Sequence, residues 1–145
     1  MGASNFFKTK DNIEVDKVLQ DLGADTFLMK SDNSIAIVGG KFDWNDEMKV
    51  VFRNGKCLGA VDLLDEYSSV AEWLIETDQV DMDNPVDTMT LDEYIQSMLL
   101  EDSYFVYNEP NGFGIAITKY DIKAVDLKLE LETFAKKSIE EHKEA

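Results

Sequence analysis

Residues 48–62 read MKVVFRNGKCLGAVD, two runs of β-forming residues joined by Asn54-Gly55. Asn and Gly both tolerate the positive φ angles that a two-residue hairpin turn requires. The pair therefore predicts a tight turn between two antiparallel strands, Met48–Arg53 and Lys56–Asp62.

Similar patterns lie on both sides of this hairpin. Thr26–Lys30 and Ser34–Val38 are short apolar runs separated by Ser, Asp and Asn, which favour tight turns. Ser103–Tyr107 and Phe113–Thr118 are separated by a segment that contains Asn, Pro and Gly. In Val125–Glu132 apolar and charged residues alternate, which is the period of a half-buried strand. We therefore expect about seven strands, most of them in hairpins.

Three segments have the spacing of amphipathic helices. Apolar residues recur at helical intervals in Asn12–Leu22, and Gly23 follows them as a stop signal. Thr90 and Glu93 have the spacing of a capping box that opens a helix. The longest segment is 63–78, in which a helix would separate an apolar side from an acidic one. The apolar side would carry Leu63, Leu64, Tyr67, Val70, Ala71 and Leu74, and the opposite side Asp65, Ser69, Glu72 and Glu76.

Strands that follow one another, rather than alternating with helices, indicate an α+β fold. We expect an antiparallel or mixed sheet with two or three amphipathic helices packed on it. At 145 residues the chain is expected to be a single domain, 1–145. Residues 1–10 and 135–145 show no strong pattern and are expected to be loose termini.

The composition is that of a folded and strongly acidic protein. It has 44% hydrophobic residues and 30 Asp and Glu against 14 Lys and Arg, for a net charge of −16. So large an apolar fraction is atypical of disordered acidic chains. The single cysteine, Cys57, excludes an intrachain disulfide, and no apolar run has the length of a membrane span or a signal peptide. We therefore expect a cytoplasmic protein.

Motifs for catalysis and for cofactor binding are missing from the sequence. The only histidine, His142, is near the C-terminus, and Cys57 lies in a predicted strand with no base assigned to it. Gly39-Gly40 and Gly112-Phe113-Gly114 lack the spacing of a phosphate-binding loop and are typical of turns and bulges. We therefore expect neither an enzyme nor a bound cofactor.

The negative charge is concentrated in one part of the chain. Residues 57–118 contain no Lys, Arg or His and hold 14 of the 30 acidic residues. Residues 1–56 carry 9 acids against 8 bases, and residues 119–145 carry 7 against 6. Because like charges on one domain repel one another, this run lowers stability unless a partner compensates it.

A basic partner is the expected compensation. Duplex DNA carries about one negative charge per 1.7 Å of its axis, and its binding proteins meet it with Lys and Arg. A rigid array of carboxylates would imitate that charge, with Tyr67, Trp73 or Tyr94 as an apolar anchor. The sequence thus predicts an inhibitor of a basic nucleic-acid-handling enzyme or toxin, of the phage anti-defence or nuclease-immunity type. The expected contact residues are Asp65, Glu72, Glu76, Asp78, Asp81, Asp83, Asp87, Asp92, Glu93, Glu101 and Asp102.

Other interpretations of the acidic residues remain open. The acids can form a soluble surface without any partner. Alternatively, Asp81, Asp83 and Asp87 supply the carboxylate oxygens that Mg²⁺ and Ca²⁺ prefer, although the EF-hand spacing is absent. Direct nucleic-acid binding is not expected, because the chain has no contiguous basic stretch.

One segment resembles a known family. Gly114-Ile115-Ala116-Ile117-Thr118-Lys119-Tyr120-Asp121-Ile122 resembles the end of a cystathionine-β-synthase-type (CBS) repeat, in which Thr-x-x-Asp follows a strand. The stretch 59–65 lies earlier in a comparable register. The resemblance implies an adenine-nucleotide-binding regulatory module in which Thr118 and Asp121 contact the nucleotide.

Overall fold

The computed structural model describes residues 2–64, 66–125 and 130–143. They form nine strands and four helices in three antiparallel sheets, which confirms the α+β class with more strands than the seven expected. The strands are β1 (Ala3–Ser4), β2 (Ala24–Leu28), β3 (Ile35–Gly40), β4 (Met48–Arg53), β5 (Lys56–Asp62), β6 (Asp87–Thr90), β7 (Phe105–Asn108), β8 (Gly114–Ile117) and β9 (Ile122–Val125). The helices are α1 (Asn12–Asp21), α2 (Val70–Glu76), α3 (Leu91–Met98) and α4 (Leu131–Lys143). Within the described ranges, no helix is long and apolar enough to cross a membrane.

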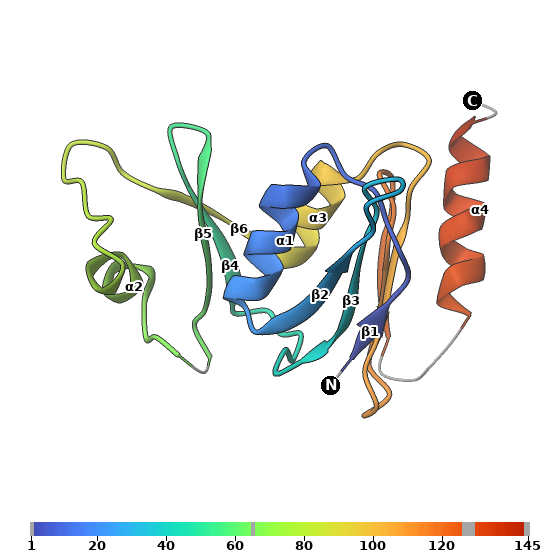
Figure 1. The fold of residues 1–145 in the computed structure, drawn as a ribbon, viewed down its shortest axis with the longest axis horizontal. Helices are drawn as coiled ribbons and strands as arrows, with labels where there is room; N and C mark the ends of the chain where they lie inside the picture. The colour runs from blue at the N-terminus through green and yellow to red at the C-terminus, as the bar shows by residue number, and fades with distance from the viewer. Residues whose placement is uncertain (1, 65, 126–129, 144–145) are drawn as a thin grey trace.

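The elements are arranged in layers along the long axis of the molecule (Figure 1). Helix α2 lies at one end, outside the sheet β5-β4-β6, and α4 lies at the other end, outside the sheet β1-β7-β8-β9. Helices α1 and α3 lie between these sheets and contribute to the largest core cluster. Two smaller cores lie under α2 and under α4.

Alternating side chains connect these cores. On β4, Val50 belongs to the central core and Val51 to the core under α2. On β7, Phe105 and Tyr107 belong to the central core and Val106 to the core under α4. Because successive strand residues point to opposite faces, a strand that is apolar throughout can be covered on both sides.

Residues 2–10 join two sheets instead of forming a loose arm. Strand β1 pairs with β7, and Phe7 forms both backbone hydrogen bonds of a bridge with Ile35 of β3, at 2.8 and 2.9 Å. The segment then pairs with the end of α3, where Lys10 N donates to the carbonyl of Met98 at 2.8 Å. The Phe7 ring is buried against Phe105. Burial of this ring is what holds a segment with no regular sequence pattern.

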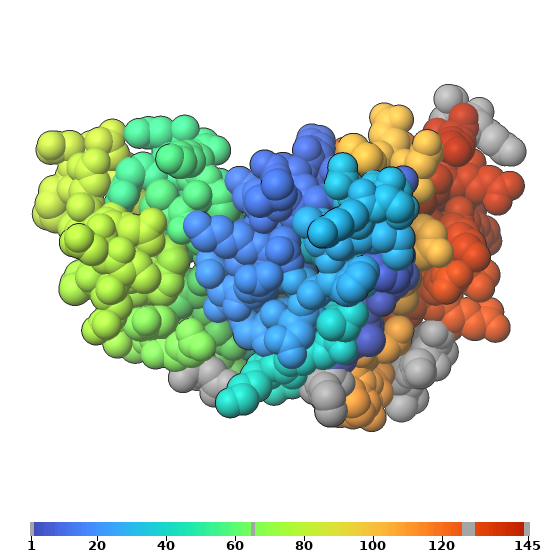
Figure 2. Space-filling view, viewed as in Figure 1, coloured from blue at the N-terminus to red at the C-terminus, as the bar shows by residue number. Residues whose placement is uncertain are grey.

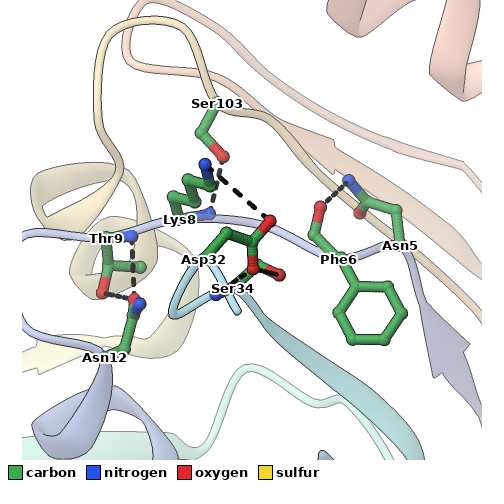
Figure 3. A network of polar contacts seen from close by, with 8 residues as sticks. All are labelled: Asn5, Phe6, Lys8, Thr9, Asn12, Asp32, Ser34 and Ser103. Carbon is green, nitrogen blue, oxygen red and sulfur yellow. Dashed lines mark hydrogen bonds and ion pairs between the residues drawn. The ribbon is translucent and has the colours of Figure 1, made fainter. Parts of the chain in front are cut away.

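Polar contacts complete the attachment of this segment (Figure 3). The backbone N–H of Lys8 donates to Ser103 Oγ at 2.8 Å. Lys8 Nζ lies 3.9 Å from the Asp32 carboxylate, which also accepts hydrogen bonds from the backbone and hydroxyl of Ser34. The β2–β3 turn, the N-terminal segment and the residues after α3 therefore meet at one place.

The predicted hairpins are confirmed. Strands β4 and β5 have the bounds expected from Asn54-Gly55, and both turn residues have positive φ, 53° and 79°. The β2–β3 and β7–β8 pairs are also antiparallel neighbours in sequence. Gly39 and Gly40 end β3 beside a register shift in its pairing with β2, as expected of bulge glycines.

Gly40 is expected to be much less tolerant of substitution than Gly55. Both have positive φ, but a Cβ at Gly40 would lie 2.5 Å from the Gly23 carbonyl oxygen, whereas a Cβ at Gly55 meets nothing within 4 Å. We expect Gly55→Ala to lower the free energy of unfolding by about 1–2 kcal/mol and Gly40→Ala by about 3 kcal/mol or more. Urea denaturation of the two variants checks this. Equal losses would show that the backbone around Gly40 moves aside.

The helix predicted over 63–78 is shorter than expected. Helix α2 begins after Ser69, whose hydroxyl accepts a hydrogen bond from Glu72 N, and ends at Glu76. The residues before it form turns, in which Leu63 N donates to the Glu47 carbonyl and Leu64 N to the Asp62 carboxylate. The predicted apolar side is right only in part. Leu63, Tyr67, Val70 and Leu74 pack against the core under α2, whereas Leu64 is exposed and the buried residue of α2 is Trp73. The N-cap hydrogen bond of Ser69 fixes the start of the helix at this residue, although the apolar spacing continues before it.

The loop that follows α2 ends in a strand. Asp87–Thr90 forms β6, which pairs with β4 along its other edge, with Val51 opposite Thr88. Helix α3 follows at once, as the Thr90 and Glu93 spacing predicted.

Residues 131–143 form a helix rather than a loose tail, and residues 144–145 lie outside the described residues. Val125 ends β9, residues 126–129 lie outside the described residues, and Leu131 and Glu132 already belong to α4, so the predicted strand was wrong at that end. Four buried residues of α4 form one face over β7 and β8: Leu131, Ala135, Ser138 and Ile139. Sequence reasoning missed this face because half of it is a small or polar residue.

Candidate partner-binding surface

Residues 66–87, called the acidic end below, cover the outer face of β5-β4-β6. They comprise the turn before α2, α2 itself and the loop that leads to β6. Trp73 is buried against Val51 and Val61, so α2 is attached to the sheet by a small core of its own. The segment forms one end of the molecule (yellow-green in Figure 2).

The C-terminal end of α2 has a regular hydrogen-bonded stop. Gln79 N donates to the Leu74 carbonyl at 2.8 Å and Asp78 N to the Ile75 carbonyl at 3.2 Å, which is the Schellman pattern. Asp78 has a φ of 56°, in the left-handed region that this motif requires. The loop after α2 therefore starts in a defined direction.

The next turn is organised by Asp81. Its carboxylate accepts hydrogen bonds from Asp83 N at 3.0 Å and from the side-chain amide of Asn84 at 2.9 Å. These bonds, the amide of Asn84 first, hold the pKa of the Asp81 carboxyl below its ordinary value. Asp81 thus remains charged in mildly acidic solution.

Arg53 connects this loop to the β4–β5 hairpin. Its Nε donates to the Asn84 carbonyl at 2.9 Å and its Nη1 to the Gln79 carbonyl at 2.7 Å. The rigid guanidinium fork thereby joins two points of the loop that are five residues apart. Within the described residues, the one arginine of the chain makes no ion pair within 4.0 Å, so its role in the loop is to hold backbone carbonyls.

The carboxylates of the acidic end are exposed and uncompensated. Among the described residues, none of them lies within 4.0 Å of a Lys, Arg or His nitrogen. The adjoining β4–β5 hairpin contributes three bases: Lys49, Arg53 and Lys56. The exposed carboxylates are Glu66, Glu72, Glu76, Asp78, Asp81, Asp83 and Asp87.

The structure brings together only part of the predicted contact set. Glu72, Glu76, Asp78, Asp81, Asp83 and Asp87 belong to the acidic end, and Asp65 lies outside the described residues. Asp92 and Glu93 are in the first turn of α3, where Glu93 accepts a hydrogen bond from Thr90 Oγ1 at 2.6 Å. They complement the helix N-terminus and are separate from the acidic end.

Glu101 and Asp102 lie in a mixed-charge region. Asp102 is 3.1 Å from Lys143 Nζ of α4, and both acids line a hollow together with Lys8. At Glu101 and Asp102 the predicted array of carboxylates therefore lies among basic side chains. The two ends of the chain supply the compensating amines.

Two acids of the 57–118 span are buried and structural. Asp62 accepts hydrogen bonds from Asn45 and from Leu64 N. Glu109 accepts one from Tyr107 Oη at 2.8 Å and one from Trp44 N at 2.9 Å. The number of acids in residues 57–118 is therefore larger than the number of carboxylates that these residues expose to solvent.

Two of the three expected aromatic anchors are buried, and the third, Tyr67, is half-buried beside the core under α2. Trp73 is buried under α2. Tyr94 is buried in the central core and donates to Glu14 at 2.8 Å. The side chains of the acidic end that sequence reasoning missed are aliphatic ones, Ile75, Val80 and Met82, all of them exposed. Their signal in the sequence was that each lies one residue from an acid.

The alternative metal site has little support from the geometry. Asp81 is occupied by donors of its own loop, and Asp87 lies on β6. In the part of the chain that the structure describes, no three His, Cys, Asp or Glu side chains are placed to hold a metal ion.

The alternative nucleotide contacts are used within the fold. Thr118 is buried, and its hydroxyl accepts hydrogen bonds from the backbone N–H groups of Tyr120 and Asp121. Ser138 of α4 lies 2.7 Å from the same hydroxyl and donates to the Asp121 carboxylate at 2.5 Å. The Thr-x-x-Asp turn therefore attaches α4 to the sheet.

Cys57 and His142 both have packing contacts within the fold. Cys57 is half-buried on β5, and burial raises the pKa of its thiol. His142 stacks on Tyr120, and its Nδ1 lies 2.8 Å from the Ser138 carbonyl. Both residues serve packing.

Comparison with known proteins leaves the site without a precedent. The chain matches no protein-family model, no curated protein and no solved structure.

Proposed function

We propose that the protein is an inhibitor that binds a basic, nucleic-acid-handling protein through the acidic end and occupies the place of the nucleic acid. The observation that carries this proposal is the set of exposed carboxylates on residues 66–87, which have no ion pair among the described residues. A nucleic-acid-binding surface presents Lys and Arg that ordinarily meet phosphates, and this array offers the opposite charge.

Rigidity of the array supports the proposal. The capped helix α2, the Schellman stop at Asp78 and the two Arg53 hydrogen bonds hold the carboxylates on ordered backbone. A preorganised surface loses less conformational entropy on binding than a flexible acidic tail does. Repulsion among the carboxylates therefore destabilises the free protein, and the positive charges of the partner remove this repulsion in the complex.

Two charge-matched variants test the proposal. The first carries Glu76→Gln, Asp78→Asn, Asp83→Asn and Asp87→Asn on the acidic end. The second carries Asp25→Asn, Asp46→Asn, Glu47→Gln and Glu140→Gln, which are exposed and make no side-chain hydrogen bond or ion pair among the described residues. Each variant removes the same number of negative charges.

The measurement is capture from a lysate of the encoding organism at about 50 mM salt, where screening is weak. We expect the wild type and the second variant to retain a basic nucleic-acid-binding protein, and the first variant to retain at least tenfold less of it. Added duplex DNA or RNA should displace the captured protein. Equal capture by both variants, capture that nucleic acid does not displace, or no basic protein captured would each contradict the proposal.

A further inference from the structure

An apolar groove lies within the acidic end. It has a volume of about 360 Å³ and is bounded by α2 on one side and the following loop on the other. Leu74, Ile75, Val80, Met82 and Val86 are among the residues that line it. Its volume falls near the lower end of the ~300–1,000 Å³ of small-ligand pockets, enough for one or two large aliphatic side chains.

The exposure of these side chains is not explained by the fold. Ile75 is 69% exposed and Met82 is 91% exposed, although the core under α2 lies close by. Single exposed aliphatic residues are ordinary, but several that line one groove are typical of an interaction site. Met in particular adapts to the shape of what covers it.

The negative charge around the groove indicates what kind of segment can bind in it. Asp81 lines the groove itself, and Glu76 and Asp83 are neighbours in sequence of lining residues. Asp78 lies two residues before Val80, another lining residue. The Arg53 guanidinium is held by loop carbonyls, so its side chain forms part of the wall. A segment that fills this groove must therefore bring positive charge to its rim.

We infer that the groove receives an amphipathic basic helix of the partner, with one or two large aliphatic side chains in the groove and Lys or Arg against the rim. This inference rests on the proposed function, because the same partner would contribute the charges. In this inference the groove provides most of the binding energy, because buried apolar side chains dominate the affinity of an interface. The carboxylates steer the basic partner toward the groove.

Two synthetic peptides test the inference without the natural partner. One is a lysine-rich amphipathic helix with a leucine face, and the other has the same lysines with every leucine replaced by alanine. Calorimetry at about 50 mM and about 500 mM salt separates the electrostatic part of binding from the apolar part. The chain offers a matched control, because Ile13 on α1 is 76% exposed and lies outside the groove.

For the leucine peptide we expect Ile75→Ser and Met82→Ser each to weaken binding by about tenfold, the cost of leaving one aliphatic contact unmade. Ile13→Ser should bind as the wild type does. In spectra of protein with ¹³C-methyl methionine, the Met82 signal should shift on binding and that of buried Met48 should not. Binding of the alanine peptide should be weak and unaffected by the groove variants.

The outcomes distinguish the two proposals. Salt-sensitive binding of both peptides with equal affinity for wild type, Ile75→Ser and Met82→Ser would overturn the groove inference and leave the charged surface standing. Absence of binding by either peptide at low salt would overturn both. A Met82 signal that does not move while the peptide binds would place the contact elsewhere and overturn the inference.

Discussion

A chain that begins at Lys10 is expected not to fold. The missing residues include β1, which pairs with β7, and Phe7, which bridges to Ile35 of β3. The Phe7 ring packs edge-on against Phe105 at a centroid distance of 4.9 Å. Loss of a buried Phe ring alone costs about 3–5 kcal/mol, and the whole stability of a domain is about 5–15 kcal/mol. Circular dichroism and an amide NMR spectrum of the truncated chain check this expectation.

Two neighbouring substitutions provide the control for the truncation. Phe7 is 1% exposed and Phe6 is 45% exposed. We expect Phe7→Ala to lower the free energy of unfolding by about 3–5 kcal/mol and Phe6→Ala by about 1 kcal/mol or less. A truncated chain that keeps a dispersed spectrum and a cooperative transition would show that β3 and β7 do not need the segment between them.

Trp73→Ala is expected to release the acidic end while the central core remains folded. Trp73, Val51 and Val61 form the buried part of the core under α2, which is distinct from the central cluster. Removal of the indole costs about 3–5 kcal/mol, and little else is buried there to resist opening. The acidic end has no Lys or Arg for trypsin, so a glutamate-specific protease is the suitable probe, with sites at Glu66, Glu72 and Glu76.

We expect the Ala variant to be cut rapidly at these sites and the wild type slowly. Trp73→Phe keeps most of the apolar ring and should restore much of the protection. Capture of the partner should likewise be strongest for the wild type, weaker for Trp73→Phe and weakest for Trp73→Ala, because the carboxylates are no longer held in fixed positions when α2 detaches. If Trp73→Ala instead lowers the stability of the whole protein in one transition, with no local cleavage, the acidic end is not a separate cooperative unit.

The elements that the sequence predicted correctly are those whose signals are local. Asn54-Gly55 specifies its turn through the φ angles of two residues, and Thr90 begins α3 directly before its apolar face. The buried side of α3 carries Leu91, Tyr94 and Ile95, as its spacing indicated. Such signals act within a few residues and do not depend on what lies elsewhere in the fold.

The errors arose where a distant part of the chain decides the structure. Residues 3–9 form the short strand β1 and isolated bridges because β3 and β7 leave two edges for them, and nothing within the segment encodes those edges. Helix α4 buries Ala135 and Ser138, which fit closely against β8 although neither is a strong apolar signal. Ser69 shortens α2 because the chain must first turn away from β5.

The amino-acid sequence by itself determined the α+β class, the three hairpins and the concentration of acids in residues 57–118, because propensity, turn chemistry and charge are properties of neighbouring residues. Only the tertiary structure decided which acids lie together at the surface. Folding buried Asp62 and Glu109, placed Lys143 beside Asp102, and left the carboxylates of residues 66–87 exposed beside an apolar groove. Burial and ion pairing depend on groups that are far apart in the chain, so the distribution of charge along the sequence does not determine them.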